Sequence, residues 1–540
     1  MTIELASSQA VTRTSASPWW KGAVIYQIYP RSFADSNGDG IGDLKGVTAH
    51  LDHVASLGCD GVWISPFFSS PMKDFGYDVA DYRDVDRIFG TIADFDELVE
   101  RAHALGLKVM IDQVYSHSSD QHPWFLESRS SRMNSKADWY VWADPKADGS
   151  PPNNWQSVFG GPSWTWDARR EQYYHHNFLK EQPQLNLHNV DVQDALLEVA
   201  KFWLDRGVDG FRLDALNFGM HDPALTDNPP VQNPGKRSRP FDFQHHLHNQ
   251  GHADLTHFIE RVRELTDQYD SIFTVAEVGG ERSAQEMKLY TAGDGRLNSA
   301  YGFDYLYAEM LNPEVVRETI RNWPGTDGEG WPSWAFSNHD APRFASRWWA
   351  EAQRAAGVRV ALMLLASLRG NVILYQGEEL GLPQAHVPFE HLRDPEAIAN
   401  WPQTLGRDGA RTPIPWTGAA DGGFGSSKTW LPLDRAHLAF NVASQRDDED
   451  SFLNWTRRMV AIRHQWPALR EGEIRLLDEG SDQVIAFERS LGGERLACVF
   501  NLSGTPAANP VAASSAIVTT GGAEPSAPIL PPMSGFIAKC

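Results

Sequence analysis

The sequence predicts an α/β protein: a closed (β/α)8 TIM barrel with a subdomain inserted after the third strand and an antiparallel β domain at the C-terminus. Three observations predict this fold. A unit of amphipathic helix, glycine and short apolar run recurs along the chain, polar residues stand at the ends of several of these runs, and strand-like alternation appears near the C-terminus. The length of 540 residues accommodates a barrel with accessory units.

The recurring unit identifies the barrel strands. Val47, Leu51 and Val54 fall on one helical face, Gly58 ends that helix, and an apolar run follows. The same order precedes several later runs. The eight predicted strands are Val24–Tyr29, Gly61–Ser65, Lys108–Asp112, Gly210–Asp214, Phe273–Glu277, Ala300–Asp304, Trp334–Asp340 and Val372–Gln376.

Two segments do not fit the barrel pattern. The stretch after the third strand, residues 116–188, is rich in Pro, Gly, Asn and Trp, and it is too long for a simple connection. Beyond a predicted helix at Phe452–His464, alternating segments such as 483–489 and 496–501 predict an antiparallel sheet. The predicted domains are therefore the barrel in two parts, 1–115 and 189–467, the inserted subdomain 116–188, and the β domain 468–540.

Composition excludes several classes of function. The net charge of −22 argues against general nucleic-acid binding, because a polyanion would be repelled over most of the surface. Three widely spaced cysteines form neither a disulfide framework nor a zinc-ligand cluster. No run of about 18 apolar residues occurs, and residues 1–18 lack a signal-peptide core. We expect a cytoplasmic monomer or homodimer that binds a small molecule, with no nucleic-acid or membrane partner.

Carboxylates stand at the ends of predicted strands, where barrel enzymes place their active sites. Cleavage of a glycosidic bond needs two such groups, one nucleophilic and one to protonate the leaving oxygen. Arg212 lies two residues before Asp214, so both point to one face, and we expect the arginine to keep Asp214 ionised. Glu277 follows an apolar run where burial and nearby carboxylates would raise its pKa, as an acid requires. For any single strand-end Asp, the alternative is a helix cap or a salt bridge.

Four motifs occur in a characteristic order: Asp112–His117, Gly210–Asp214, Ala276–Glu277 and Phe336–Asp340. They resemble the four best-known sequence regions of the α-amylase superfamily, glycoside hydrolase family 13. The resemblance covers the chain from about Trp19 to the C-terminus. It implies that Asp214 is the nucleophile, Glu277 the general acid/base and Asp340 a third carboxylate that grips substrate hydroxyls. It also assigns substrate binding to Arg212, His117 and His339.

Two further segments narrow the substrate. Asp74–Asp78 resembles the segment whose tyrosine, here Tyr77, stacks on the sugar in the first subsite. Arg407–Arg411 resembles a segment of exo-acting α-glucosidases, in which residues matching Asp74 and Arg407 pair at the pocket floor. Such a pair would close the cleft to a long chain.

The sequence also departs from the family pattern in places. Gln182–Asn186 resembles a fifth family region and adds Gln182 to the predicted substrate-binding residues, but Gln184 stands where Asp is common. Ser116 stands where the family has Asn. The residue after the nucleophile is Ala215, whereas relatives that prefer α-1,6 bonds usually carry Val there. This difference favours α-1,4 bonds in short substrates.

The segment 35–43 offers oxygen ligands at alternate positions, with glycines that permit a tight turn. In the family the same segment binds a structural Ca²⁺ or Mg²⁺. The alternative is an Asx-rich turn without metal. The predicted metal ligands are Asp35, Asn37, Asp39, Ile41 and Asp43.

The sequence thus predicts an exo-acting, retaining α-glucosidase that hydrolyses terminal non-reducing α-glucosyl residues of short oligosaccharides such as maltose or sucrose, with transglucosylation. An α-glucosyl transferase or isomerase, similar to trehalose or isomaltulose synthases, is the main alternative, because such enzymes share the three carboxylates. A non-catalytic relative similar to the heavy chains of amino-acid transporters is disfavoured, because the chain lacks a membrane anchor and retains all three carboxylates.

Overall fold

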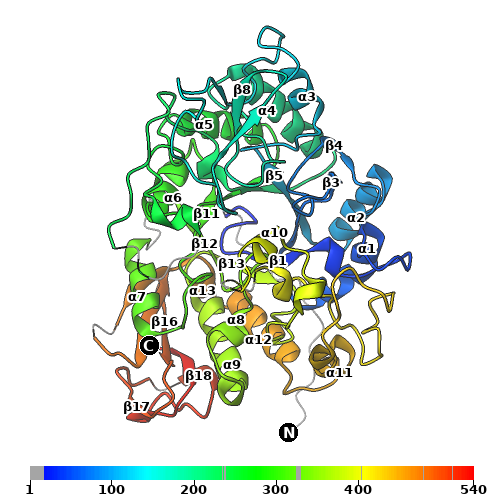
Figure 1. Ribbon diagram of the computed structural model, residues 1–540. Coiled ribbons are helices and arrows are strands. Elements are labelled where there is room, and N and C mark those ends of the chain that lie inside the picture. The colour runs from blue at the N-terminus through cyan, green and yellow to red at the C-terminus, as the bar shows by residue number, and fades with distance from the viewer. Residues whose placement is uncertain are drawn as a thin grey trace.

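The computed structural model describes residues 17–540 except 234, 236–238, 324–329, 403, 405, 478–479 and 514; most of the N-terminal segment 1–18 therefore lies outside it. Eight parallel strands close a barrel at the centre of the molecule (Figure 1). The strands follow one another around the barrel in chain order: β1 (Val24–Ile28), β2 (Gly61–Ile64), β5 (Lys108–Val114), β9 (Gly210–Asp214), β10 (Phe273–Glu277), β11 (Ser299–Tyr301), β12 (Trp331–Ala335) and β13 (Asn371–Tyr375). The predicted fold class is confirmed.

The bounds of the seventh strand were predicted wrongly. β12 ends at Ala335, and the motif Phe336–Asp340 lies in the following loop. The side-chain oxygen of Asn338 accepts hydrogen bonds from the amides of Asp340 and Ala341, so the chain turns away from the sheet at this point. The sixth strand also ends early, at Tyr301, and leaves Asp304 exposed.

Helices cover the outside of the barrel, and side-chain caps fix where several of them begin. Asp43 accepts the amide of Gly46 at the start of the first helix, and Thr91 forms a capping box with Asp94 at the second. The longer helices are α1 (Leu44–Ser56), α2 (Ile92–Ala104), α4 (Val190–Leu204), α5 (Leu255–Thr266), α6 (Ser283–Thr291), α7 (Pro313–Asn322), α9 (Glu351–Ser367) and α12 (Phe452–Gln465). The shorter ones are α3 (Pro123–Ser128), α8 (Phe344–Arg347), α10 (Pro395–Ala399), α11 (Val442–Arg446) and α13 (Pro467–Glu471).

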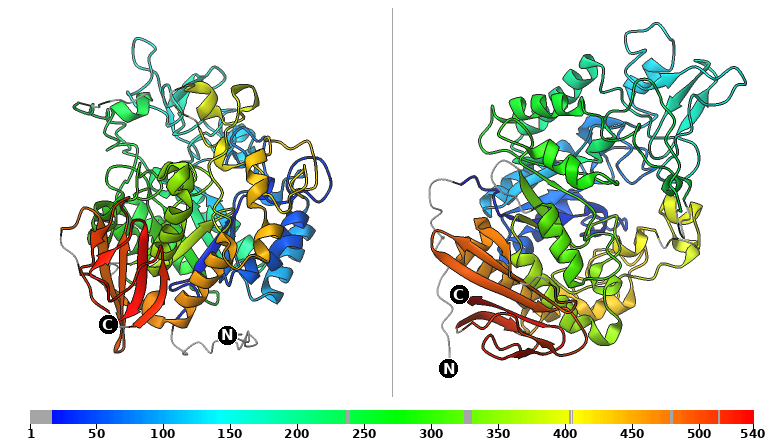
Figure 2. Two further views of the ribbon diagram at one scale, coloured as in Figure 1. Left: turned by 90° about the horizontal axis from the view of Figure 1, so that it is seen from below. Right: turned by 90° about the vertical axis from the view of Figure 1, so that its left-hand side faces the viewer.

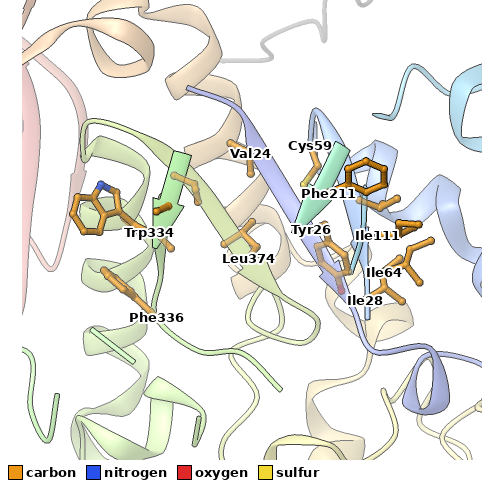
Figure 3. Close-up of a cluster of buried hydrophobic side chains, with 14 of the residues drawn as sticks. Val24, Tyr26, Ile28, Cys59, Ile64, Ile111, Phe211, Trp334, Phe336 and Leu374 are labelled. Atoms are coloured by element: carbon orange, nitrogen blue, oxygen red, sulfur yellow. The ribbon is translucent and has the colours of Figure 1, made fainter. Parts of the chain in front are cut away.

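Alternation along the barrel strands separates two hydrophobic cores. Val24, Tyr26 and Ile28 of β1 belong to the large core that lies between the strands and the helices (Figure 3). Ile25 belongs instead to a small core inside the barrel, with Trp63 and other inward residues. Successive side chains of a strand point to opposite faces. Phe211 and Leu213 of β9 point outward into the large core, so the alternate residues of this strand point into the barrel. This period places Arg212 and Asp214 inside.

Two further units flank the barrel on opposite sides (Figure 2). The segment between β5 and α4 carries α3 and a three-stranded sheet of β6 (Trp142–Ala143), β8 (Gln172–His175) and β7 (Trp164–Asp167). β3 (Phe68–Ser69) pairs with β4 (Asp81–Val85) beside it. The C-terminal sheet has the order β14 (Glu473–Leu476), β15 (Val484–Leu491), β16 (Glu494–Asn501), β20 (Ser534–Lys539), β18 (Ser515–Thr520), and β17 (Ala507–Ala508) pairs with β19 (Ile529–Leu530).

The C-terminal sheet is joined to the barrel by buried arginine side chains. Arg489 of β15 donates from Nη1 to the carbonyl oxygens of Ser367 and Leu469, at 2.6 and 2.7 Å. These carbonyls lie in α9 and α13, so the contact joins the sheet to two helices. Within the part of the chain that is described, no helix has the length and apolar character needed to span a bilayer.

Candidate active site

One guanidinium organises the reacting centre inside the barrel. Arg212 of β9 is fully buried and contacts three carboxylates: Nη1 lies 2.5 Å from Asp112 Oδ1 and 2.5 Å from Asp214 Oδ1, and Nη2 lies 2.7 Å from Glu277 Oε1. Tyr301 donates to the same Glu277 oxygen at 3.1 Å. The structure therefore brings the predicted nucleophile and the predicted acid/base together around a single cation.

The sequence predicts that Arg212 keeps Asp214 ionised, but burial and the neighbouring carboxylates act in the opposite direction. Burial raises the pKa of Asp214 well above its usual value; Arg212 opposes the shift, while the negative charges of Glu277 and Asp112 add to it. Burial likewise raises the pKa of Asp112 to about 6, again against Arg212. The arginine therefore does not by itself keep Asp214 ionised, because one cation faces three carboxylates in a desolvated site. Such a cluster favours the retention of one proton among the three carboxylates, and a retaining glycosidase needs that proton on the acid, Glu277, with the nucleophile Asp214 ionised.

The backbone after the nucleophile is strained. Ala215 has φ +40° and ψ 45°, in the left-handed region that non-glycine residues rarely adopt, and its amide donates to Glu277 Oε2 at 3.1 Å. A β-branched residue would be costlier than alanine in this conformation. The turn therefore gives a backbone reason for the absence of Val after Asp214.

Asp340 is held by three neighbours. It contacts His339 Nε2 at 3.1 Å, Arg411 Nη2 at 2.7 Å and Arg407 Nη1 at 3.2 Å. Burial opposes its charge, but His339, Arg411 and Arg407 outweigh burial and hold the pKa of Asp340 below its usual range. Burial lowers the pKa of His339 to about 3, so at neutral pH the two arginines carry the effect. Asp340 is thus ionised, in contrast to the cluster around Arg212.

The remaining predicted substrate-binding residues gather at one end of the cavity, here called the closed end. Arg407 Nη2 lies 2.8 Å from Asp74 Oδ1, and Gln182 donates to the other oxygen of Asp74 at 3.2 Å. His117 Nε2 lies 3.1 Å from the amide nitrogen of Gln182. Tyr77 stacks on His339 with an interplanar angle of 6°. These contacts join the loops after β5 and β12 to a segment more than 300 residues away from Asp74 in the sequence.

The opposite end of the same cavity, here called the open end, has a different lining. The cavity has a volume of about 860 Å³. Aromatic residues dominate its walls at the open end, with an ion pair between Arg239 and Glu396 at 3.2 Å. Gly279 lies two residues after the acid/base, and a Cβ there would come within 2.5 Å of the Phe303 ring. The aromatic residues are Phe218, Phe241, Phe303 and Tyr307.

Sequence reasoning missed several residues of this site. Asp394 contacts Arg407 Nη2 at 2.9 Å and is fully buried. In the sequence, an Asp directly before a Pro indicates the start of a helix and no other role. Arg411 and Asp112 lie within the motifs described above, but the sequence predicted no catalytic or binding role for them. The open-end aromatics had no sequence signal, because a lone Phe in a long loop cannot be told from a core residue.

The predicted metal loop is a series of Asx turns. Asp35 accepts amides from Asn37, Gly38 and Gly40, and Asn37 and Asp39 accept amides two residues ahead. The candidate metal-ligand atoms of this loop are all oxygens, which suits Ca²⁺ or Mg²⁺. The carboxylates of Asp35, Asp39 and Asp43 do not gather within 4.8 Å of one another, so a cation would also depend on the Asn37 side chain and the Ile41 carbonyl.

Comparison with known proteins agrees with this geometry. Residues 27–472 match the model of the α-amylase catalytic domain. A probable α-glucosidase of Rhizobium meliloti is 52% identical over 494 residues, which cover 90% of this chain and 89% of that protein. An oligo-1,6-glucosidase of Parageobacillus thermoglucosidasius is 37% identical, with 90% of each chain covered. Among solved structures, the α-glucosyl transfer enzyme XgtA has a TM-score of 0.92 and 49% identity over 97% of this chain and 100% of its own. The trehalulose synthase MutB of Pseudomonas mesoacidophila has a TM-score of 0.88 and 32% identity, over 97% and 99%.

Proposed function

The chain belongs to the α-amylase family and is a glycoside hydrolase, and we propose that it is an exo-acting, retaining α-glucosidase. Its substrates are short oligosaccharides with a terminal non-reducing α-glucosyl residue, such as maltose or sucrose, with a preference for α-1,4 bonds. The observation that carries this proposal is the closed end. Arg407 joins Asp74, Asp394 and Asp340 there, so the cavity holds one terminal sugar and a long chain cannot pass through.

The reaction proceeds in two displacements. Asp214 attacks the anomeric carbon of the terminal glucosyl unit while Glu277 gives its proton to the departing glycosidic oxygen, and a glucosyl ester forms on Asp214. Glu277 then removes a proton from water, which attacks the anomeric carbon and releases α-glucose and the free Asp214 carboxylate. Both carboxyls contact one guanidinium, and this supports the short separation of retaining enzymes over the roughly 6.5–9.5 Å of inverting ones.

The geometry assigns the other groups as follows. Asp340, kept ionised by its arginines, accepts hydrogen bonds from hydroxyls of the distorted sugar, and neutral His117 and His339 contribute at the same end. The ring of Tyr77 provides the stacking face. The preference for α-1,4 bonds rests on the identity of the residue after the nucleophile, which is Ala215 where relatives that prefer α-1,6 bonds usually carry Val.

Transfer to an acceptor other than water is the second candidate activity, because the open end is aromatic. An alcohol that binds between Phe241 and Phe303 would exclude water from the glucosyl ester and accept the sugar in its place. The names of two solved relatives, an α-glucosyl transfer enzyme and a trehalulose synthase, support transfer and isomerisation as alternatives to hydrolysis.

Product analysis tests the proposal. Maltotriose labelled at its reducing end should lose single glucose units from the other end, and proton NMR should detect α-glucose first. Starch viscosity should hardly fall. Early β-glucose would contradict retention, and a rapid loss of viscosity would contradict exo action. Sucrose converted mainly into an isomeric disaccharide, with little free glucose, would instead support the isomerase alternative.

We also propose that the loop 35–43 binds a structural Ca²⁺ or Mg²⁺. A ligand that binds only the folded state raises its stability, so removal of the ion with EDTA should lower the melting temperature and added Ca²⁺ should restore it. The Asp39→Ala variant is the control, because Asp39 is exposed and its loss should make melting insensitive to EDTA. Unchanged melting of the wild type, with no metal by elemental analysis, would favour the empty turn.

A further inference from the structure

Histidines are concentrated in a segment that the reaction does not use. Five of the nineteen histidines lie between residues 245 and 257, at the end of the long loop that joins β9 to α5 and in the first turn of α5. Histidine-rich tracts are typical of metal binding. His246 stacks on Phe241 of the cavity wall, whereas the other four histidines do not line the cavity.

Tertiary structure adds a distant histidine to this tract. One ligand atom from each of His188, His252 and Asp254 lies within 4.8 Å of the other two. Among the described residues this is the one group of three or more His, Cys, Asp or Glu side chains so arranged. His188 lies just before α4, and His252 and Asp254 lie just before α5, so the group bridges the starts of two adjacent helices. It is far from the Asp35–Asp43 loop in the sequence and shares no residue with it.

The rings of this group are held in place by their surroundings. His188 Nε2 lies 2.8 Å from the carbonyl oxygen of His221 and therefore donates its proton there, which leaves Nδ1 with a free lone pair. A carbonyl that orients a histidine in this way is the usual outer partner of a metal-bound imidazole. His188 also packs edge-on against His252, with ring centroids 5.1 Å apart. The Nδ1 lone pair of His188 is thus oriented before any ligand arrives, whereas Nδ1 of His252 accepts the amide of Asp254 at 3.3 Å, a bond that a cation would displace.

Spacing and chemistry agree with a small divalent cation. His252 Nδ1 and Asp254 Oδ2 lie 3.8 Å apart, close to the roughly 3.4 Å between two tetrahedral ligands of zinc. Two imidazoles and a carboxylate suit Zn²⁺ and other late first-row ions, whereas Ca²⁺ and Mg²⁺ prefer oxygen donors. Next to the group, the buried Nδ1 of His221 has no hydrogen-bond partner.

We propose that His188, His252 and Asp254 form a binding site for Zn²⁺ or a similar first-row divalent cation, with solvent completing the coordination. The bound ion joins the start of α4 to the end of the β9–α5 loop. That loop begins at the nucleophile strand and carries Phe218 and Phe241 of the open end. Zinc would consequently stabilise this wall of the cavity without touching the reacting carboxylates.

Titration of the metal-stripped full chain with ZnCl2 tests the site independently of glucosidase activity. We expect one equivalent to bind and the melting temperature to rise, with no competition from CaCl2. Co²⁺ bound in place of Zn²⁺ should give the visible absorption that is typical of a site with a low coordination number. Asp254→Asn should weaken zinc binding about 10- to 100-fold. Asp254 is exposed and makes no capping hydrogen bond in α5, so this variant should fold normally.

Matched variants separate the site from loose surface binding. His252→Asn should lose the high-affinity equivalent, whereas His257→Asn should keep it, because His257 is exposed in the same tract but outside the group. Equal loss in both histidine variants would overturn the proposal, as would unchanged binding in His252→Asn and Asp254→Asn. Failure of the wild type to bind zinc at micromolar concentrations would overturn it as well.

Discussion

The closed and open ends of the cavity recognise a ligand by different physical means. At the closed end, charged and polar groups hold one another in a buried network in which Arg407 contacts three carboxylates. At the open end, aromatic rings form the wall, and Arg239 and Glu396 remain partly exposed. Buried hydrogen-bonding groups reject a ligand that leaves them unpaired, whereas apolar walls discriminate weakly between ligands of similar size. The difference indicates strict selection of the terminal glucosyl unit and tolerance toward the group attached to it.

The largest effect is expected where the two ends meet. Asp214→Ala removes the nucleophile and should lower kcat at least about 10⁴-fold. Binding of glucose, which depends on the closed end, should persist in calorimetric titration. If the variant lost glucose binding as completely as turnover, Asp214 would belong to the recognition network and the two functions would not be separable.

Glu277→Gln keeps the shape of the acid/base but removes its proton. We expect a loss of about 10²–10⁴-fold for maltose, whose leaving group needs protonation. A p-nitrophenyl glucoside should suffer much less in its first step, because its leaving group departs as an anion. Equal losses with both substrates, in burst-phase kinetics, would contradict the assignment of Glu277 as acid.

A pair of arginine variants tests the comparison directly. Arg407→Ala at the closed end leaves Asp74 and Asp394 buried without their partner, which typically costs about 3–5 kcal/mol, or about 10²–10⁴-fold in kcat/KM for maltose. Arg239→Ala at the open end breaks a partly exposed pair and should cost less than about tenfold. The inhibition constant of glucose should rise in the first variant alone. Similar losses in both would remove the distinction between the two ends.

Gly279→Ala should change the open end and spare the closed end. Its Cβ would meet the Phe303 ring at 2.5 Å, so the ring must move, and overpacking of this kind costs roughly 1–3 kcal/mol. We expect the ratio of kcat/KM between substrates that differ in the leaving group to change about tenfold. The inhibition constant of glucose should stay unchanged. A shifted glucose inhibition constant would show that the strain reaches the closed end.

The smallest effect concerns His117, which must stay neutral at the closed end. Burial lowers the pKa of His117 to about 4, below its unfolded value of about 6.5. As pH falls from 6.5 to 4, the unfolded chain takes up a proton that the folded chain refuses, so stability falls by about 1.4 kcal/mol per pH unit from this group. Buried carboxylates such as Asp112 act in the opposite direction, but equally in wild type and variant. In His117→Asn, the free energy of unfolding measured with urea should therefore depend less steeply on pH in this window, by the uptake of one proton. Parallel curves of this free energy against pH for the wild type and the variant would contradict the prediction.

The sequence by itself determined the fold class and the reacting strands. Period-2 alternation predicted that Arg212 and Asp214 share a face, and the structure places both inside the barrel because Phe211 and Leu213 point outward. It could not set the end of the seventh strand, because the turn at Asn338 depends on side-chain hydrogen bonds to the backbone. Local patterns therefore sufficed for elements whose burial repeats regularly along the chain.

Only the tertiary structure decided which distant residues share a site and in what ionisation state. Asp394 and Arg407 meet Asp74 because the barrel closes and brings loops from both ends of the catalytic domain together. The raised pKa of Asp214 depends on burial and on two other carboxylates competing for Arg212, none of which adjacency in the sequence encodes. The grouping of His188 with His252 and Asp254 likewise depends on two adjacent helices. Sequence records the chemical identity of a side chain, but its partners and its desolvation are properties of the folded chain.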